Sequence, residues 1–174
     1  MKRIMSVVAA VVLATCCKRS DSILPPATHD GSNTFGCMLD GNPWLPSGPG
    51  IGTSVYASSG GFVRDLNGKW QISIKAFNSS DTIGFKLDDC VAGTYALEDN
   101  GRSVPGAGRN YGFLNTSSGI YHSTDSLHRG QVVIHYADTV KGIVSGTFEM
   151  KLFGSLKNAT ITLSDGRFDF KNHQ

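Results

Sequence analysis

The segment 142–153 has the clearest pattern in the chain, a strict alternation of apolar and polar residues. One face would carry Val144, Gly146, Phe148, Met150 and Leu152, and the other Ser145, Thr147, Glu149 and Lys151. Successive side chains of a strand point to opposite sides, so a period of two is typical of a half-buried β-strand. Such a strand needs antiparallel neighbours and a second layer over its apolar face. The segment therefore predicts a β-rich domain around it.

Shorter alternating segments recur along the chain, separated by Gly, Asn and Asp residues that favour turns. They predict strands at 35–39, 62–66, 70–76, 83–87, 95–97, 111–114, 119–121, 131–136, 159–163 and 167–171. Asn67-Gly68 predicts a hairpin, and so do residues 137–141, between 131–136 and the segment 142–153, and Ser164-Asp165-Gly166 near the C-terminus. Trp70 is expected to point inward and Gln71 outward. No long amphipathic helix is supported, so the predicted fold is a single all-β domain, an antiparallel β-sandwich or flattened meander barrel.

The N-terminus has the two features of a secretory signal peptide. Lys2 and Arg3 precede the apolar run 4–14, which is shorter than the stretch of about 20 residues that a membrane-spanning helix needs. The sequence that follows, Leu13-Ala-Thr-Cys16-Cys17, resembles a bacterial lipobox, in which a cysteine becomes the lipidated first residue of the mature protein. Cys16 fits this role better, because Leu13 and Ala14 occupy the usual upstream places, and Cys17 is the alternative.

These features divide the chain into three parts. Residues 1–15 are predicted to be the lipoprotein signal peptide, 16–34 the lipidated cysteine with a flexible tether, and 35–174 the β domain. The tether is polar and aperiodic, and Pro25-Pro26 should stiffen it locally. The protein is then expected to be held by its lipid anchor in a bacterial cell envelope, with the outer membrane as the expected location.

The net charge of the predicted mature protein is close to zero. Without Lys2 and Arg3, the 16 basic residues become 14, equal in number to the 14 acidic residues. A neutral domain without a basic stripe does not suit phosphate backbones, so no nucleic-acid partner is expected.

The sequence contains none of the common catalytic or metal-binding motifs in complete form. The five histidines form no i, i+2 or i, i+4 pair, and no Cys-x-x-Cys or His-Glu-x-x-His occurs. Ser145 lies in a predicted strand and lacks the Gly-x-Ser-x-Gly elbow of serine hydrolases. Asp88-Asp89 lacks the further oxygen ligands of a calcium loop. We therefore expect no catalytic residue, cofactor or metal, and place local function in the Gly-rich loops around 46–52 and 101–109.

Cys37 and Cys90 are the two cysteines of the predicted domain. In an oxidising compartment they could form a disulfide, which would stabilise the fold by about 4 kcal/mol in the chain-entropy description. The alternative is two buried free cysteines.

Four segments resemble landmarks of a family of bacterial cell-envelope lipoproteins of unknown function. They are Leu24-Pro-Pro-Ala-Thr28, Asn33-Thr-Phe-Gly-Cys37, Gly142-Ile-Val-Ser-Gly-Thr-Phe148 and Asp165-Gly-Arg-Phe-Asp169. The resemblance implies a lipid-anchored single-domain β protein, with Cys16 or Cys17 in the place of the lipidated residue. It implies no catalytic residues.

The leading functional hypothesis is a non-enzymatic, lipid-anchored binding or structural module. Its partner would be an envelope protein, a glycan or a small apolar ligand, held at the loops or in the interior. The alternative is a hydrolase of envelope glycans or lipids, whose Asp and His residues are assembled by the fold. Convergence of His122, His128 and Asp88 or Asp89 in one cleft would favour that alternative.

Overall fold

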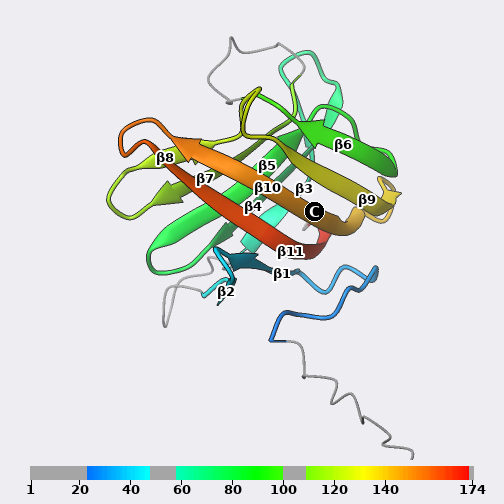
Figure 1. The fold of residues 1–174 in the computed structure, drawn as a ribbon. Coiled ribbons are helices and arrows are strands. Elements are labelled where there is room, and N and C mark those ends of the chain that lie inside the picture. Colours follow the sequence, from blue (N-terminus) through cyan, green and yellow to red (C-terminus); the bar gives the residue numbers. More distant parts are fainter. Residues whose placement is uncertain (1–22, 48–57, 100–108, 173–174) are drawn as a thin grey trace, which may run out of the picture.

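The computed structural model describes residues 23–47, 58–99 and 109–172, and these form one all-β domain of antiparallel strands, as predicted (Figure 1). The strands are β1 (Thr34–Leu39), β2 (Asn42–Trp44), β3 (Ser58–Arg64), β4 (Trp70–Phe77), β5 (Asp81–Leu87), β6 (Gly93–Leu97), β7 (Tyr111–Thr116), β8 (Tyr121–Ser123), β9 (Gly130–Asp138), β10 (Ile143–Gly154) and β11 (Ala159–Lys171). The described residues include no helix that is long and apolar enough to cross a membrane.

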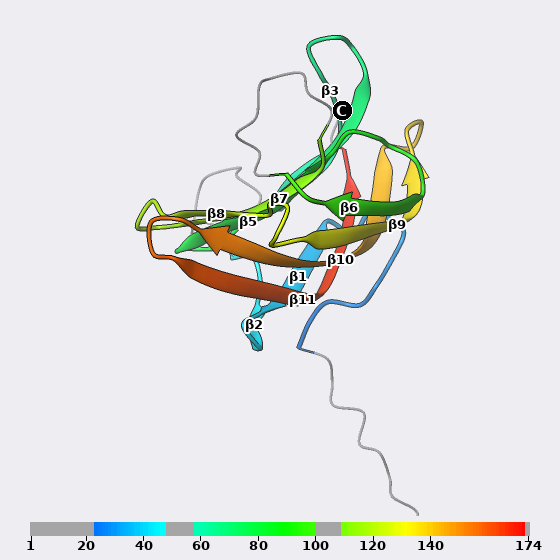
Figure 2. The ribbon, with the colours of Figure 1, turned by 45° about the horizontal axis from the view of Figure 1, so that its top comes forward.

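All the strands belong to one sheet that curls into a half-barrel (Figure 2). The main path runs β2-β1-β11-β10-β8-β7-β5-β4-β3. The sheet branches at β10, because the first part of that strand pairs with β9 and Phe153, near its end, pairs with Ser123 of β8. β9 in turn pairs with β6. β3 returns to contact β10 and β11, which encloses the core.

A side-chain amide helps to hold the returning edge. Asn172, just after β11, accepts a hydrogen bond from the backbone N–H of Phe62 (3.0 Å) and donates one to its carbonyl oxygen (2.7 Å). Asn172 therefore pairs with β3 much as one residue of a neighbouring strand would.

The predicted hairpin of β9 and β10 is confirmed, and β10 lies at the centre of the fold. Val144, Gly146, Phe148, Met150 and Leu152 are all buried, as the alternation predicted. The rings of Phe35, Phe85 and Phe168 surround Phe148, with centroid separations of 5.1, 5.7 and 6.5 Å. Gly146 cannot carry a side chain, because an added Cβ would collide with the Val133 carbonyl oxygen.

The predicted hairpin at Ser164-Asp165-Gly166 is wrong. Residues 159–171 form one continuous strand, and the pairing register shifts by one residue between Phe148 and Met150. A β-bulge absorbs the extra residue, and Asp165 adopts a positive φ of 52° there. This bulge explains why the inward residue Leu163 has an odd number and the inward residues Phe168 and Phe170 have even numbers.

The predicted orientations of Trp70 and Gln71 are also wrong. Trp70 is the first residue of β4, and its exposed ring stacks against the Arg64 guanidinium at 4.1 Å. Gln71 is buried, and its amide donates a hydrogen bond to Asp88 (2.8 Å). A cation–π contact and a side-chain hydrogen bond thus override the alternation at this strand end.

Candidate functional site

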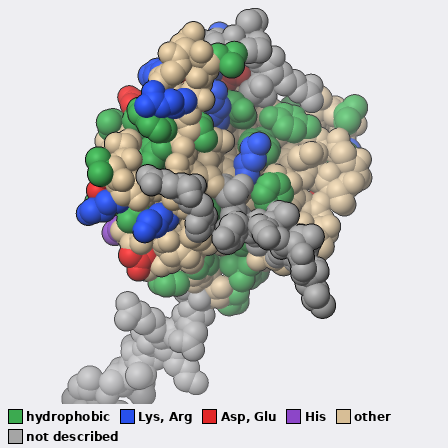
Figure 3. Space-filling model, turned by 180° about the vertical axis from the view of Figure 1, so that it is seen from behind, with side chains coloured by type: hydrophobic (Ala, Val, Ile, Leu, Met, Phe, Trp, Pro, Cys, Tyr) green, Lys and Arg blue, Asp and Glu red, His purple; other side chains and the backbone are tan. Residues whose placement is uncertain are grey.

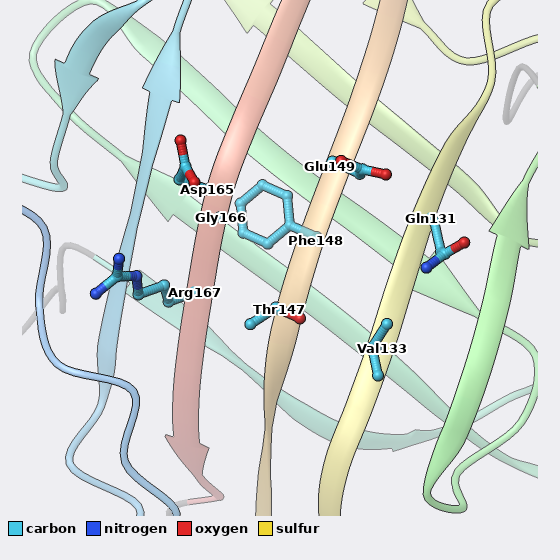
Figure 4. A pocket seen from close by; sticks show the side chains of 8 residues that line it. All are labelled: Gln131, Val133, Thr147, Phe148, Glu149, Asp165, Gly166 and Arg167. Atoms are coloured by element: carbon cyan, nitrogen blue, oxygen red, sulfur yellow. The ribbon is translucent and has the colours of Figure 1, made fainter.

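A polar groove lies on the outer face of the sheet, across β9, β10 and β11. Figure 4 shows the side chains that line its first hollow, of about 300 Å³. A second hollow of about 480 Å³ adjoins the first, since Gln131 and Glu149 line both. We call the two hollows together the outer groove. Its main polar side chains are those of Arg129, Gln131, Thr147, Glu149, Lys151, Thr162, Asp165 and Arg167.

Strand pairing places these side chains in rows. Thr147 lies between Val133 of β9 and Arg167 of β11, and Glu149 lies opposite Gln131. The bulge adds Asp165 to the rim of the groove beside these rows. The outer groove therefore results from the outward half of the alternation plus one irregularity in β11.

The groove offers both donors and acceptors. Glu149 and Asp165 contribute carboxylates, Arg167 a guanidinium and Gln131 an amide. Within the described part of the chain, the side chains of Glu149 and Gln131 have no hydrogen-bond partner, and both are exposed. These groups are available to an extended ligand that carries many hydroxyl or amide groups.

Next to the groove, a buried carboxylate binds the N-terminal segment. Asp169 is 1% exposed. It accepts hydrogen bonds from the Thr28 hydroxyl (2.7 Å) and from the backbone N–H groups of Asp30 (3.1 Å), Gly31 (2.9 Å) and Ser32 (3.2 Å). Four donors around one carboxyl group replace the water that it loses on burial.

This contact involves part of the segment 16–34, which was predicted to be a flexible tether. Residues 25–33 lie against the domain, and residues 16–22 are outside the described residues. Arg167 donates to the Pro25 carbonyl oxygen (3.1 Å), and the Asn33 side chain accepts from the backbone of Lys171 (3.0 Å). Composition alone suggested a linker, but the polar residues of this segment satisfy buried groups of β11. We call residues 25–33 the docked segment.

The docked segment also brings a histidine to Ser145. His29 Nδ1 lies 2.6 Å from Ser145 Oγ, and its ring lies 6.1 Å from that of His135. Ser145 has no exposed surface, because the docked segment covers it. The pair therefore holds the segment in place and offers no accessible nucleophile.

The four residues considered for a hydrolase site do not converge. His122 is buried on the inner side, against Gly154, whereas the ring of His128 stacks on Phe153 at 4.7 Å, on the other face of β10. Asp88 accepts from Gln71, and Asp89 from the backbone of Cys90. Among the described residues, no group of three or more His, Cys, Asp or Glu side chains could hold a metal ion.

Cys37 and Cys90 are both free thiols in this structure. Cys37 is buried on β1, and burial raises its pKa to about 12. The pKa of Cys90, just after β5, is raised by burial and by the neighbouring Asp89 carboxylate. Both shifts lower the fraction of reactive thiolate.

We expect this difference in burial to appear in alkylation of a chain that starts at Lys18. Without reductant at pH 8, iodoacetamide should add slowly to Cys90 and spare Cys37 in the folded protein, because Cys37 is both buried and protonated. In urea both should react, giving a mass with two adducts. A mass without adducts in urea would instead reveal a disulfide.

Several predicted sites fall outside the described residues. These are Cys16 and Cys17, residues 48–52 of the first loop and 101–108 of the second. The role of Asp169 was not predicted, because an acid between two inward Phe residues has the pattern of an ordinary solvent-facing position. The outer groove was not predicted either, although the change from odd to even inward positions in 161–170 could have indicated the bulge.

Comparison with known proteins gives one family. Searches of curated proteins and of solved structures find no match to the chain. A family profile described as "Domain of unknown function (DUF6252)" matches residues 58–170, from the start of β3 almost to the end of β11. The match leaves out β1, β2 and the docked segment, and includes the described residues that line the outer groove. Because this match covers more than half of the chain, the protein belongs to the DUF6252 family.

Proposed function

We propose that the protein is a lipid-anchored bacterial cell-envelope protein and that its domain is a non-enzymatic module that binds an envelope glycan. The anchor is supported by the apolar run 4–14 and by Leu13-Ala-Thr-Cys16 directly after it. Cys16 would carry the acyl chains, with Cys17 as the alternative. The expected location is the outer membrane.

The observation that carries the binding role is the outer groove. It is elongated over three strands, and unpaired carboxylate and amide groups line it together with basic side chains. A glycan presents hydroxyl groups along its whole length, each able to donate and to accept a hydrogen bond. A glycan therefore matches this mixed set of donors and acceptors better than an apolar ligand does. The interior is filled by core side chains such as Phe85, Phe148 and Phe168, which also favours the surface over the interior as the binding place.

We expect Glu149→Gln to weaken glycan binding about 10- to 100-fold, the range for loss of a hydrogen bond to a charged group. The test uses the chain from Lys18, titrated with soluble glycan strands released from bacterial cell walls and followed by amide chemical shifts. Shifts should concentrate on β9, β10 and the bulge of β11. The protein's other glutamate is the matched control, since Glu98 is exposed outside the groove.

Two results would contradict this proposal. One is an absence of shifts over the groove strands, and the other is equal weakening by Glu149→Gln and Glu98→Gln. Mass analysis of the glycan after incubation separates binding from the hydrolase alternative, because a binding module returns the strands intact.

A further inference from the structure

Apolar side chains are exposed where the chain enters the domain. Ile23 is 68% exposed, Leu45 is 42% exposed, and Pro26 is also exposed. Leu45 and Pro25 lie together over Gly36, since a Cβ added there would be 3.0 Å from Leu45 Cδ2 and 2.7 Å from Pro25 Cδ. In both ribbon views the described chain starts beside β2 (Figures 1 and 2). We call Ile23, Pro26 and Leu45 the entry patch.

The docked segment fixes how far this patch can lie from the lipid anchor. If the whole tether from Cys16 to Thr34 were free, its 18 residue steps could span about 60 Å. Asp169 and Arg167 hold the chain from Pro25 onward, so only the steps from Cys16 to Ile23 remain, which span at most about 25 Å. The domain must therefore stay close to the bilayer surface, with its entry patch nearest to the anchor.

We propose that the entry patch rests on the lipid surface and so orients the anchored domain. This inference rests on the lipid anchor of the proposed function. Ile23 and Leu45 supply apolar surface at the headgroup level, and Lys18 and Arg19, between the anchor and the patch, suit anionic headgroups. Arg167 both holds Pro25 and lines the outer groove, so the groove opens beside the membrane-facing side.

Figure 3 shows the molecule from behind, where hydrophobic and acidic side chains interrupt small clusters of Lys and Arg. The entry patch, in contrast, is apolar, and the short chain from Cys16 to Ile23 limits its distance from the lipid.

Vesicle capture tests the orientation without requiring natural lipidation. A chain from Lys18 with an N-terminal hexahistidine tag is held on vesicles of phosphatidylethanolamine, phosphatidylglycerol and a nickel-chelating lipid. A fluorophore is attached at Leu45→Cys or, as a control, at Leu156→Cys. Both variants also carry Cys90→Ser, which removes the more exposed native thiol, and Cys37 is buried and should not react with the label. Leu156 is 79% exposed, in the connection from β10 to β11.

Brominated lipids should quench the label at position 45 several-fold more than the label at position 156. Adding Asp169→Asn should reduce this difference, because the docked segment would be released and the tether lengthened. Equal quenching at the two positions would overturn the proposal. A concentration-dependent dimer in solution that Ile23→Ser with Leu45→Ser abolishes would also overturn it, by making the patch a contact between copies.

The same design separates this inference from the proposed anchor. The tag replaces the acyl chains, so selective quenching would stand even if Cys16 were found unmodified in the native protein. Conversely, a lipidated Cys16 with equal quenching would leave the anchor intact and remove the membrane-facing patch. Circular dichroism melts of each variant verify that the domain remains folded.

Discussion

Asp169→Asn is expected to release residues 25–33 from the sheet and to lower the free energy of unfolding by roughly 2–3 kcal/mol, the scale of hydrogen bonds to a charged group. The asparagine side chain keeps one acceptor oxygen and places an NH₂ donor among the four donors that now bind Asp169. Hydrogen exchange should report the release directly. The amides of Asp30, Gly31 and Ser32 should exchange about two orders of magnitude faster than in the unmodified chain.

Asp165→Asn is the matched control for this prediction. It makes the same chemical change on the same strand, but Asp165 is exposed on the bulge and its carboxylate has only Ser164 as a hydrogen-bond partner, at 3.4 Å, among the described residues. Its effect on stability should stay within about 0.5 kcal/mol, as for ordinary surface substitutions. Unchanged protection of the three amides in Asp169→Asn would show that the docked segment does not depend on Asp169.

Phe148→Ala is expected to cost about 3–5 kcal/mol, the range for removing a buried aromatic side chain and leaving a cavity. Phe148 is 3% exposed and lies among Phe35, Phe85 and Phe168 at the centre of the curled sheet. A loss of this size would remove a large part of the stability of a typical domain. The measurement is the urea midpoint, with the slope of the transition used to verify two-state unfolding.

Val140→Ala provides the comparison for the core prediction. Val140 is 88% exposed in the turn between β9 and β10, so removing its methyl groups should leave the urea midpoint nearly unchanged. If Phe148→Ala shifted the midpoint no more than Val140→Ala, β10 would be peripheral to the stable core.

The core of this fold could be predicted because alternation depends only on local sequence. Phe148 and Ile74 are buried where their strands placed them. The end of the chain could not be predicted in the same way. Ser164-Asp165-Gly166 has turn chemistry, yet β1 and β10 pair with both halves of β11 and keep it one strand. Long-range pairing therefore decided between a turn and a bulge.

The candidate site was harder to predict for the same reason. Asp169 and Ser145 have the spacing of solvent-facing residues, and their burial comes from a segment more than 100 residues earlier in the chain. No local pattern records such a contact. The outer groove likewise needs the alignment of three strands, because neither Gln131 nor Glu149 nor Arg167 forms a motif with its own neighbours.

The docked segment connects the two proposals. It shortens the reach from Cys16 to the domain, and through Arg167 it touches the rim of the outer groove. With the proposed anchor, a ligand would therefore meet the groove close to the bilayer.

Native mass spectrometry of the protein extracted from its own envelope in mild detergent tests lipid anchoring and glycan binding together. We expect a chain that begins at an acylated Cys16 and carries a bound glycan, and we expect Glu149→Gln to lose the glycan while it keeps the acyl chains. A chain without acyl mass and without glycan, or one that carries a stoichiometric protein in place of glycan, would contradict this expectation.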